Sequence, residues 1–114
     1  MKRGLVPVAV GLWMLFSPVS GFPQDGIDLE NEGKALLETN CSMCHAVGSE
    51  GDSAYPEAPA FRMLAQRYPI DSLAEALAEG LFTGHPDMPE FVFEVDELSA
   101  ILAYLHSIQV PKSR

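Results

Sequence analysis

The pentapeptide Cys41-Ser42-Met43-Cys44-His45 contains both cysteines and one of the three histidines of this 114-residue chain. Two cysteines separated by two residues are typical of a redox disulfide, of half a zinc site and of covalent cofactor attachment. A zinc site needs a second pair of ligands, and the other histidines, His85 and His106, are not at paired spacing. A thioredoxin-like disulfide needs a βαβ context, which the helical pattern described below does not provide.

The histidine directly after the second cysteine favours cofactor attachment. Two thiols can add to the two vinyl groups of a haem, while an adjacent imidazole binds the iron. Each residue type in the pattern is therefore required by one bond. The pentapeptide predicts one haem c, held covalently by thioether bonds to Cys41 and Cys44, with His45 as the proximal iron ligand.

The second axial ligand is predicted from the remaining methionines and histidines. Met88 lies in Gly84-His85-Pro86-Asp87-Met88-Pro89, where two prolines and a glycine exclude a helix interior. It follows His45 by 43 residues, with a predicted helix between them, so it can return across the haem as the distal ligand. His85 is a competitor, because imidazole also binds iron. Met63 lies in a short helical stretch, where a flexible thioether more often fills a core.

Apolar residues on both sides of these motifs repeat at helical spacing, so we expect an all-α domain of three to five short helices and long loops. One helix is predicted over residues 29–40 and another over 96–108. A third is predicted to open with a capping box at Ser72 and Glu75 and to stop near Gly80. The positions expected to face the core are Leu29, Gly33, Leu36 and Leu37 in the first helix and Leu98, Ile101, Leu102, Leu105 and Ile108 in the last.

Residues 46–58 form a long segment without helical spacing, in which Gly48, Gly51 and Pro56 favour turns. A loop of this length is uncommon in a compact domain unless it has a function. We therefore predict that it wraps an edge of the haem.

The chain has seven basic and 16 acidic residues and a net charge of −9. Nucleic-acid binding rests on Lys and Arg that neutralise phosphates, so such an excess of acid argues against a nucleic-acid partner. Hydrophobic residues make up 47% of the sequence, which is too many for a disordered acidic tail. The composition therefore predicts a folded acidic domain.

Residues 1–21 have the layout of a secretory signal peptide. Two basic residues precede an apolar run over 5–16, which is too short to span a bilayer, and Ser17-Pro18 ends it. Cleavage after Gly21 would leave a haem domain over residues 22–114, in which five basic and 16 acidic residues give a net charge of −11. The predicted location is the periplasm. The alternative is an uncleaved membrane anchor that faces the periplasm.

These features together resemble the small monohaem class I cytochromes c of the bacterial, periplasmic type. The resemblance covers Asp25 to Ile108 and rests on the haem-attachment pentapeptide, on the Met-Pro loop over 84–89 and on Ala58-Pro59-Ala60-Phe61. In this family a proline carbonyl accepts a hydrogen bond from the proximal imidazole, which implies that role for Pro59. Pro56 lies nearby and is the alternative.

The resemblance also implies that the N- and C-terminal helices cross, with Gly33 permitting the close approach and Tyr104 packing nearby. Some members have a tryptophan that binds a haem propionate. The single tryptophan, Trp13, falls in the expected signal, so Arg67 and Tyr68 are the candidates for that contact here, although both residue types are common at surfaces.

Such a protein is expected to be a one-electron carrier and not an enzyme, because iron bound by both His45 and Met88 has no open position for a small-molecule substrate. Its acidic surface is expected to steer it toward redox proteins with a basic docking patch, with possible transient association at the membrane surface. Two alternatives stay open. One is a haem enzyme or gas-binding sensor with an open or labile sixth position, and the other is a haem module of a larger dehydrogenase or oxidase complex.

Overall fold

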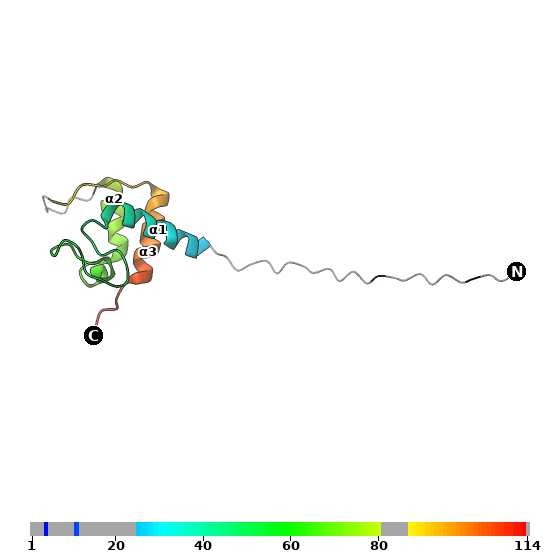
Figure 1. Ribbon diagram of the computed structural model, residues 1–114. Helices are drawn as coiled ribbons and strands as arrows, with labels where there is room; N and C mark the ends of the chain where they lie inside the picture. Colours follow the sequence, from blue (N-terminus) through cyan, green and yellow to red (C-terminus); the bar gives the residue numbers. More distant parts are fainter. Residues whose placement is uncertain (1–3, 5–10, 12–24, 81–86, 114) are drawn as a thin grey trace.

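Five helical elements lie in the part of the chain that the structure describes (Figure 1). The computed structural model describes residues 25–80 and 87–113 together with Gly4 and Gly11, and these ranges contain no strand. The elements are α1 (Asp25–Cys41), the 3-10 helices η1 (Phe61–Gln66) and η2 (Ile70–Ser72), α2 (Leu73–Glu79) and α3 (Val95–Ile108). The predicted all-α class is confirmed. The expected signal peptide and the domain start at residue 22 lie outside the described residues, apart from the two isolated glycines.

The two terminal helices cross and pack against each other (Figure 1). At the crossing, Gly33 of α1 is buried, and a Cβ atom there would overlap the carbonyl group of Ala100 and lie 2.9 Å from the nitrogen of Ile101. Ala100 and Ile101 have no exposed surface. Because glycine has no side chain, the backbones of α1 and α3 can approach closely enough to exclude a Cβ atom, as the resemblance implied.

The core is formed mainly by one face of α3 and by single residues from the other segments. Leu98, Ile101 and Leu105 are buried as predicted. Leu29 is an exception, because 38% of its surface is exposed where the first turns of α1 extend beyond the contact with α3 (Figure 1). The buried hydrophobic residues are Leu37, Val47, Phe61, Leu64, Ile70, Phe93, Leu98, Ala100, Ile101, Tyr104 and Leu105.

The capping box predicted at Ser72 and Glu75 is wrong. Ser72 has helical dihedral angles, φ −68° and ψ −13°, and its side chain makes no capping hydrogen bond. An N-cap residue needs an extended backbone, and Ser72 instead ends η2, which runs directly into α2. The end of α2 is as expected, since Gly80 follows it with φ +98°, a conformation that favours glycine.

A capping box is present at the start of α3. Glu94 has an extended backbone, and its side chain accepts from the backbone N–H of Glu97, while the Glu97 carboxylate accepts from the backbone N–H of Glu94 at 2.9 Å. The box was missed because Glu at the N-cap is less typical than Ser, Thr, Asp or Asn. It fixes the first turn of the helix that supplies five of the eleven buried hydrophobic residues.

Tyr104 ties α3 to the long loop. Its hydroxyl donates to the carbonyl oxygen of Val47 at 2.9 Å, and both residues are buried. Burial raises the pKa of Tyr104, so its hydroxyl keeps the proton that this bond needs. No helix among the described residues is both long enough and apolar enough to cross a membrane.

Candidate haem site

The two cysteines lie at the C-terminal end of α1, on a turn that continues the helix. Cys41 is the last residue of α1, and its carbonyl oxygen accepts from the backbone N–H of Cys44 at 3.1 Å and of His45 at 2.9 Å. Three side chains near the C-terminal end of α1 donate back to helix carbonyl groups, and one of these carbonyls, that of Glu38, is among the last four of the helix. These donors are Thr39, Asn40 and Ser42, each bonded to the carbonyl four residues earlier at 2.6–2.9 Å.

The thiols of Cys41 and Cys44 are free and half-buried. Burial, with a smaller effect of Cys44, raises the pKa of the Cys41 thiol to about 11. Cys41 is therefore a neutral thiol at physiological pH in the free chain. Met43, between the two cysteines, is 89% exposed, so the pentapeptide lies at the molecular surface.

The imidazole of His45 is fixed by a hydrogen bond and by a ring contact. Nδ1 lies 2.8 Å from the carbonyl oxygen of Pro59. A carbonyl oxygen can only accept, so Nδ1 carries a hydrogen, and in the neutral imidazole Nε2 is then the nitrogen whose lone pair can bind a metal. The ring centroid of Phe61 lies 4.7 Å from that of His45, with an angle of 31° between the planes. The structure thus places Pro59, and not Pro56, against the imidazole.

The loop over residues 46–58 is folded back onto the pentapeptide. The backbone N–H of Ala46 donates to Oγ of Ser53 at 3.0 Å, and the N–H of Tyr55 donates to the carbonyl oxygen of Cys44 at 3.1 Å. Just beyond the loop, the N–H of Phe61 donates to the carbonyl oxygen of Ala46 at 3.0 Å. These three bonds hold both ends of the loop beside His45.

Met88 is connected to the pentapeptide through its neighbour in the sequence. The hydroxyl of Tyr55 donates to Oδ2 of Asp87 at 3.1 Å, and this bond, with the negative charges of Asp87 and Glu57, raises the pKa of Tyr55. Tyr55 is itself bonded through its N–H to Cys44. One residue therefore links the attachment turn to the segment of Met88, which is half-buried. His85, the competing ligand, lies outside the described residues.

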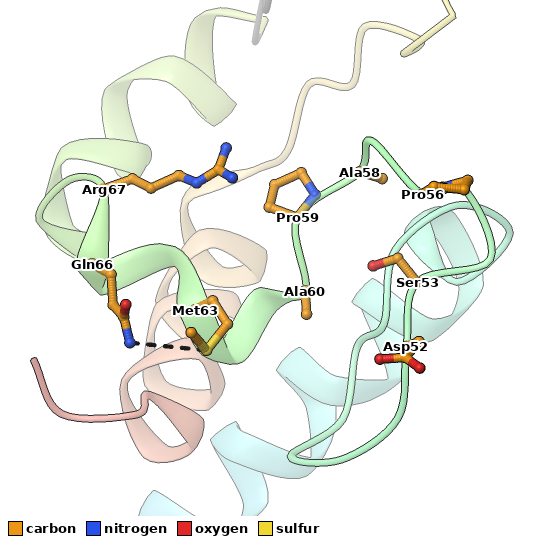
Figure 2. A pocket seen from close by; sticks show the side chains of 9 residues that line it. All are labelled: Asp52, Ser53, Pro56, Ala58, Pro59, Ala60, Met63, Gln66 and Arg67. Carbon is orange, nitrogen blue, oxygen red and sulfur yellow. Dashed lines mark hydrogen bonds between the residues drawn. The ribbon is translucent and has the colours of Figure 1, made fainter.

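A cavity of about 780 Å³ lies next to this arrangement (Figure 2). Its walls come from η1 on one side and from the loop on the other, with residues 58–60 running between them (Figure 2). The lining residues are Asp52, Ser53, Pro56, Ala58, Pro59, Ala60, Met63, Gln66 and Arg67. None of Cys41, Cys44, His45 and Met88 is among them, so the cavity lies beside the predicted haem ligands, and Ser53 and Pro59 connect it to the surroundings of His45.

The sequence favoured Met63 as a core residue. In the structure it is instead half-buried and lines this cavity. Its sulfur lies 3.9 Å from Nε2 of Gln66. Arg67 and Tyr68, the candidates for a propionate contact, are exposed. The sequence analysis did not single out Arg62, the residue before Met63. Its Nη1 atom is buried and has no hydrogen-bond partner in the described part of the chain.

These residues fit a covalently bound haem. Two free thiols stand three residues apart, and the next residue presents an imidazole whose Nδ1 is already hydrogen-bonded, which is the usual arrangement of a metal-binding histidine. The described residues contain no group of three or more His, Cys, Asp or Glu side chains arranged to hold a metal ion.

Comparison with known proteins gives one match. The family model described as cytochrome c matches residues 30–109, which is more than two thirds of the chain. This range begins within α1, includes the pentapeptide and Met88, and ends just after α3. Comparisons with curated proteins and with solved structures found no significant match.

Proposed function

This chain belongs to the cytochrome c family, and from that premise we propose that it carries single electrons on one haem c whose iron is bound by His45 and Met88. Members of the family bind haem c covalently and transfer electrons with it, so haem c is the cofactor of this protein. When bound, the haem iron supplies a ferric/ferrous couple. The residues of this chain attach the cofactor, orient its ligands and exclude water.

The hydrogen bond between His45 Nδ1 and the Pro59 carbonyl is the observation that supports this proposal most directly. It sets the tautomer in which Nε2 is free to bind iron, and it increases the basicity of the imidazole. The Phe61 ring restrains the rotation of the imidazole. A ligand held in this way needs little rearrangement when the charge on the iron changes, as rapid electron transfer requires.

The link between Tyr55 and Asp87 supports Met88 as the second ligand, because it holds the adjacent residue close to the attachment turn. Thioether coordination favours ferrous iron and raises the reduction potential. An iron bound by both His45 and Met88 would have no position left for a small-molecule substrate. The arrangement therefore suits a carrier better than an enzyme.

The surface of the domain suits a transient protein partner. All 16 acidic residues lie in the described ranges, and none of them is buried. An acidic surface attracts a partner with a basic docking patch, and the attraction weakens as salt increases. Met43 and Ser42 are exposed at the pentapeptide, which would allow a partner to approach the attachment edge. We place this exchange in the periplasm, in line with the expected signal over residues 1–21.

Met88→Ala tests the proposed ligation. We expect the variant to keep its covalently bound haem, to lose the weak near-infrared band of an iron–sulfur bond in the ferric protein, and to have a lower reduction potential, because the thioether that favours ferrous iron is gone. The absorption spectrum and a redox titration, made on protein matured in a periplasm, measure these changes.

Met63→Ala is the matched control, since Met63 is also a half-buried methionine but lines the neighbouring cavity. It should keep both the band and the potential of the wild type. Persistence of the band in Met88→Ala, or its absence from the wild-type protein, would show that Met88 is not the ligand and would favour an open-site haem protein.

Tyr55→Phe tests whether the Tyr55–Asp87 bond holds the Met88 segment in place. Without the hydroxyl, the segment loses one link to the attachment turn, so Met88 should leave the iron more easily. We expect a few-fold higher affinity of the ferric protein for cyanide, measured by spectral titration. Ser49→Ala, which removes an exposed hydroxyl from the same loop outside this contact, should leave the affinity unchanged. Equal cyanide affinities in the two variants would contradict the role of Tyr55.

A further inference from the structure

The side chain of Gln109, the residue that follows α3, joins this helix to η1. Its Oε1 accepts from the backbone N–H of Ala65 at 2.8 Å. Its Nε2 donates to the carbonyl oxygen of Phe61 at 2.9 Å and to that of Leu105 at 2.7 Å. Both amide hydrogens and one oxygen lone pair are therefore used. One half-buried side chain contacts the beginning and the end of η1 and the last turn of α3.

The backbone beside Gln109 strengthens the same connection. The N–H of Val110 donates to the carbonyl oxygen of Arg62 at 2.9 Å, between the two positions that Gln109 holds. Four hydrogen bonds thus join the residues that end α3 to η1 or to the helix itself. Such a short 3-10 helix has weak internal hydrogen bonds, so its position depends strongly on contacts of this kind.

Phe61 connects η1 to the imidazole of His45. Its ring is 8% exposed and lies 4.7 Å from the imidazole, measured between centroids. Its carbonyl is bound by Gln109, and its N–H is bound by Ala46, the residue after His45. A shift of η1 would therefore move the ring that packs against His45 and would strain the backbone next to it. It would also move residues 59 and 60, which lead into η1 and include the Pro59 carbonyl.

We propose that Gln109 is a positioning residue for the proximal imidazole: by fixing η1 it sets the orientation of the Phe61 ring and the Pro59 carbonyl that hold His45. This inference rests on the proposed function, in which His45 is the proximal ligand. Groups that orient a metal ligand and bond to it also tune the metal, so the position of η1 should influence the iron. Gln109 would then act on the haem from the far end of the last helix.

Gln109→Ala in the haem-loaded protein is the principal test. Removing the amide frees η1, so we expect roughly tenfold faster hydrogen exchange at the Ala65 N–H. We also expect shifted electron paramagnetic resonance g values of the ferric iron and a shifted reduction potential, because both depend on the orientation of the axial imidazole. Gln109→Glu is the milder variant: it keeps an acceptor for Ala65 but loses the donor to Phe61, so it should shift the g values while the Ala65 N–H stays protected.

His106→Ala is the matched control, because His106 lies in the same part of α3 but contacts Asp71 of η2, with Nε2 2.7 Å from Oδ1. This variant should leave the g values and the potential unchanged. Wild-type g values and potential in both Gln109 variants, or the same shifts in His106→Ala, would overturn the inference.

A failure of the proposed function can be distinguished from a failure of the inference about Gln109. Absence of the near-infrared band from the wild-type protein would remove its basis whatever the Gln109 variants do. If the wild-type band is present and depends on Met88 while the Gln109 variants behave as wild type, only the inference about Gln109 is wrong.

Discussion

Replacing both Cys41 and Cys44 with serine is expected to abolish covalent retention of haem. A hydroxyl does not form the thioether bonds that the two thiols make with the vinyl groups, and the described residues contain no other cysteine. The single variants should each keep one thioether and retain part of the haem through denaturation. Haem staining after denaturing electrophoresis, together with extraction by acidified organic solvent, measures the change from full retention to none.

Ser42→Ala controls for the disturbance of the turn, because Ser42 lies between the two cysteines and its hydroxyl donates to the carbonyl oxygen of Glu38 at 2.6 Å. It should retain haem as the wild type does. Haem that stays attached in the double serine variant would place the covalent bond elsewhere and would contradict the attachment role of the pentapeptide.

Gly33→Ala is expected to destabilise the folded protein by about 2–3 kcal/mol, in the upper part of the usual cost of overpacking. The added methyl group would overlap the carbonyl group of Ala100, and backbone atoms cannot rotate away as a flexible side chain can. The two helices must therefore separate at a point where Ala100 and Ile101 have no exposed surface. The higher helix propensity of alanine offsets about 1 kcal/mol of the cost at most. Denaturant unfolding of the haem-loaded protein measures the difference.

Gly26→Ala is the control on the same helix. A Cβ atom at Gly26 meets no heavy atom within 4 Å, so this variant should be as stable as the wild type or slightly more stable. A Gly33→Ala variant with the stability of Gly26→Ala would mean that the crossing of α1 and α3 is looser than the structure shows.

The Gly33 prediction and the inference about Gln109 concern the two ends of α3. Near its beginning the helix is packed against α1 at Ala100, and at its end it is joined to η1 by Gln109. One helix thus positions both the segment that ends in the cysteines and the segment that holds the imidazole. This explains how a residue remote in sequence from the pentapeptide is able to affect it.

Local patterns in the sequence were sufficient to predict the helices and the chemistry of the pentapeptide. The residues that bind the cofactor lie within five consecutive positions, so Cys41, Cys44 and His45 indicate haem c without knowledge of the fold. Helical spacing likewise predicted α1 and α3 to within four residues at their starts, because burial of one helix face imposes its period on the sequence. The predicted core positions of α3 followed from the same rule.

Only the tertiary structure decided which distant groups meet. By sequence, Pro56 remained an alternative to Pro59, and the distance of 2.8 Å between the Pro59 carbonyl oxygen and Nδ1 of His45 distinguishes them. The contacts of Tyr55 with Asp87 and of Gln109 with η1 join residues 32 to 48 positions apart. No periodicity encodes such pairs. The donor–acceptor distance of a hydrogen bond can vary by only a few tenths of an ångström, and the packing of the whole chain sets that distance. The sequence therefore predicted the types of the ligands, while the packing of α3 against α1 and η1 decided the surroundings of His45.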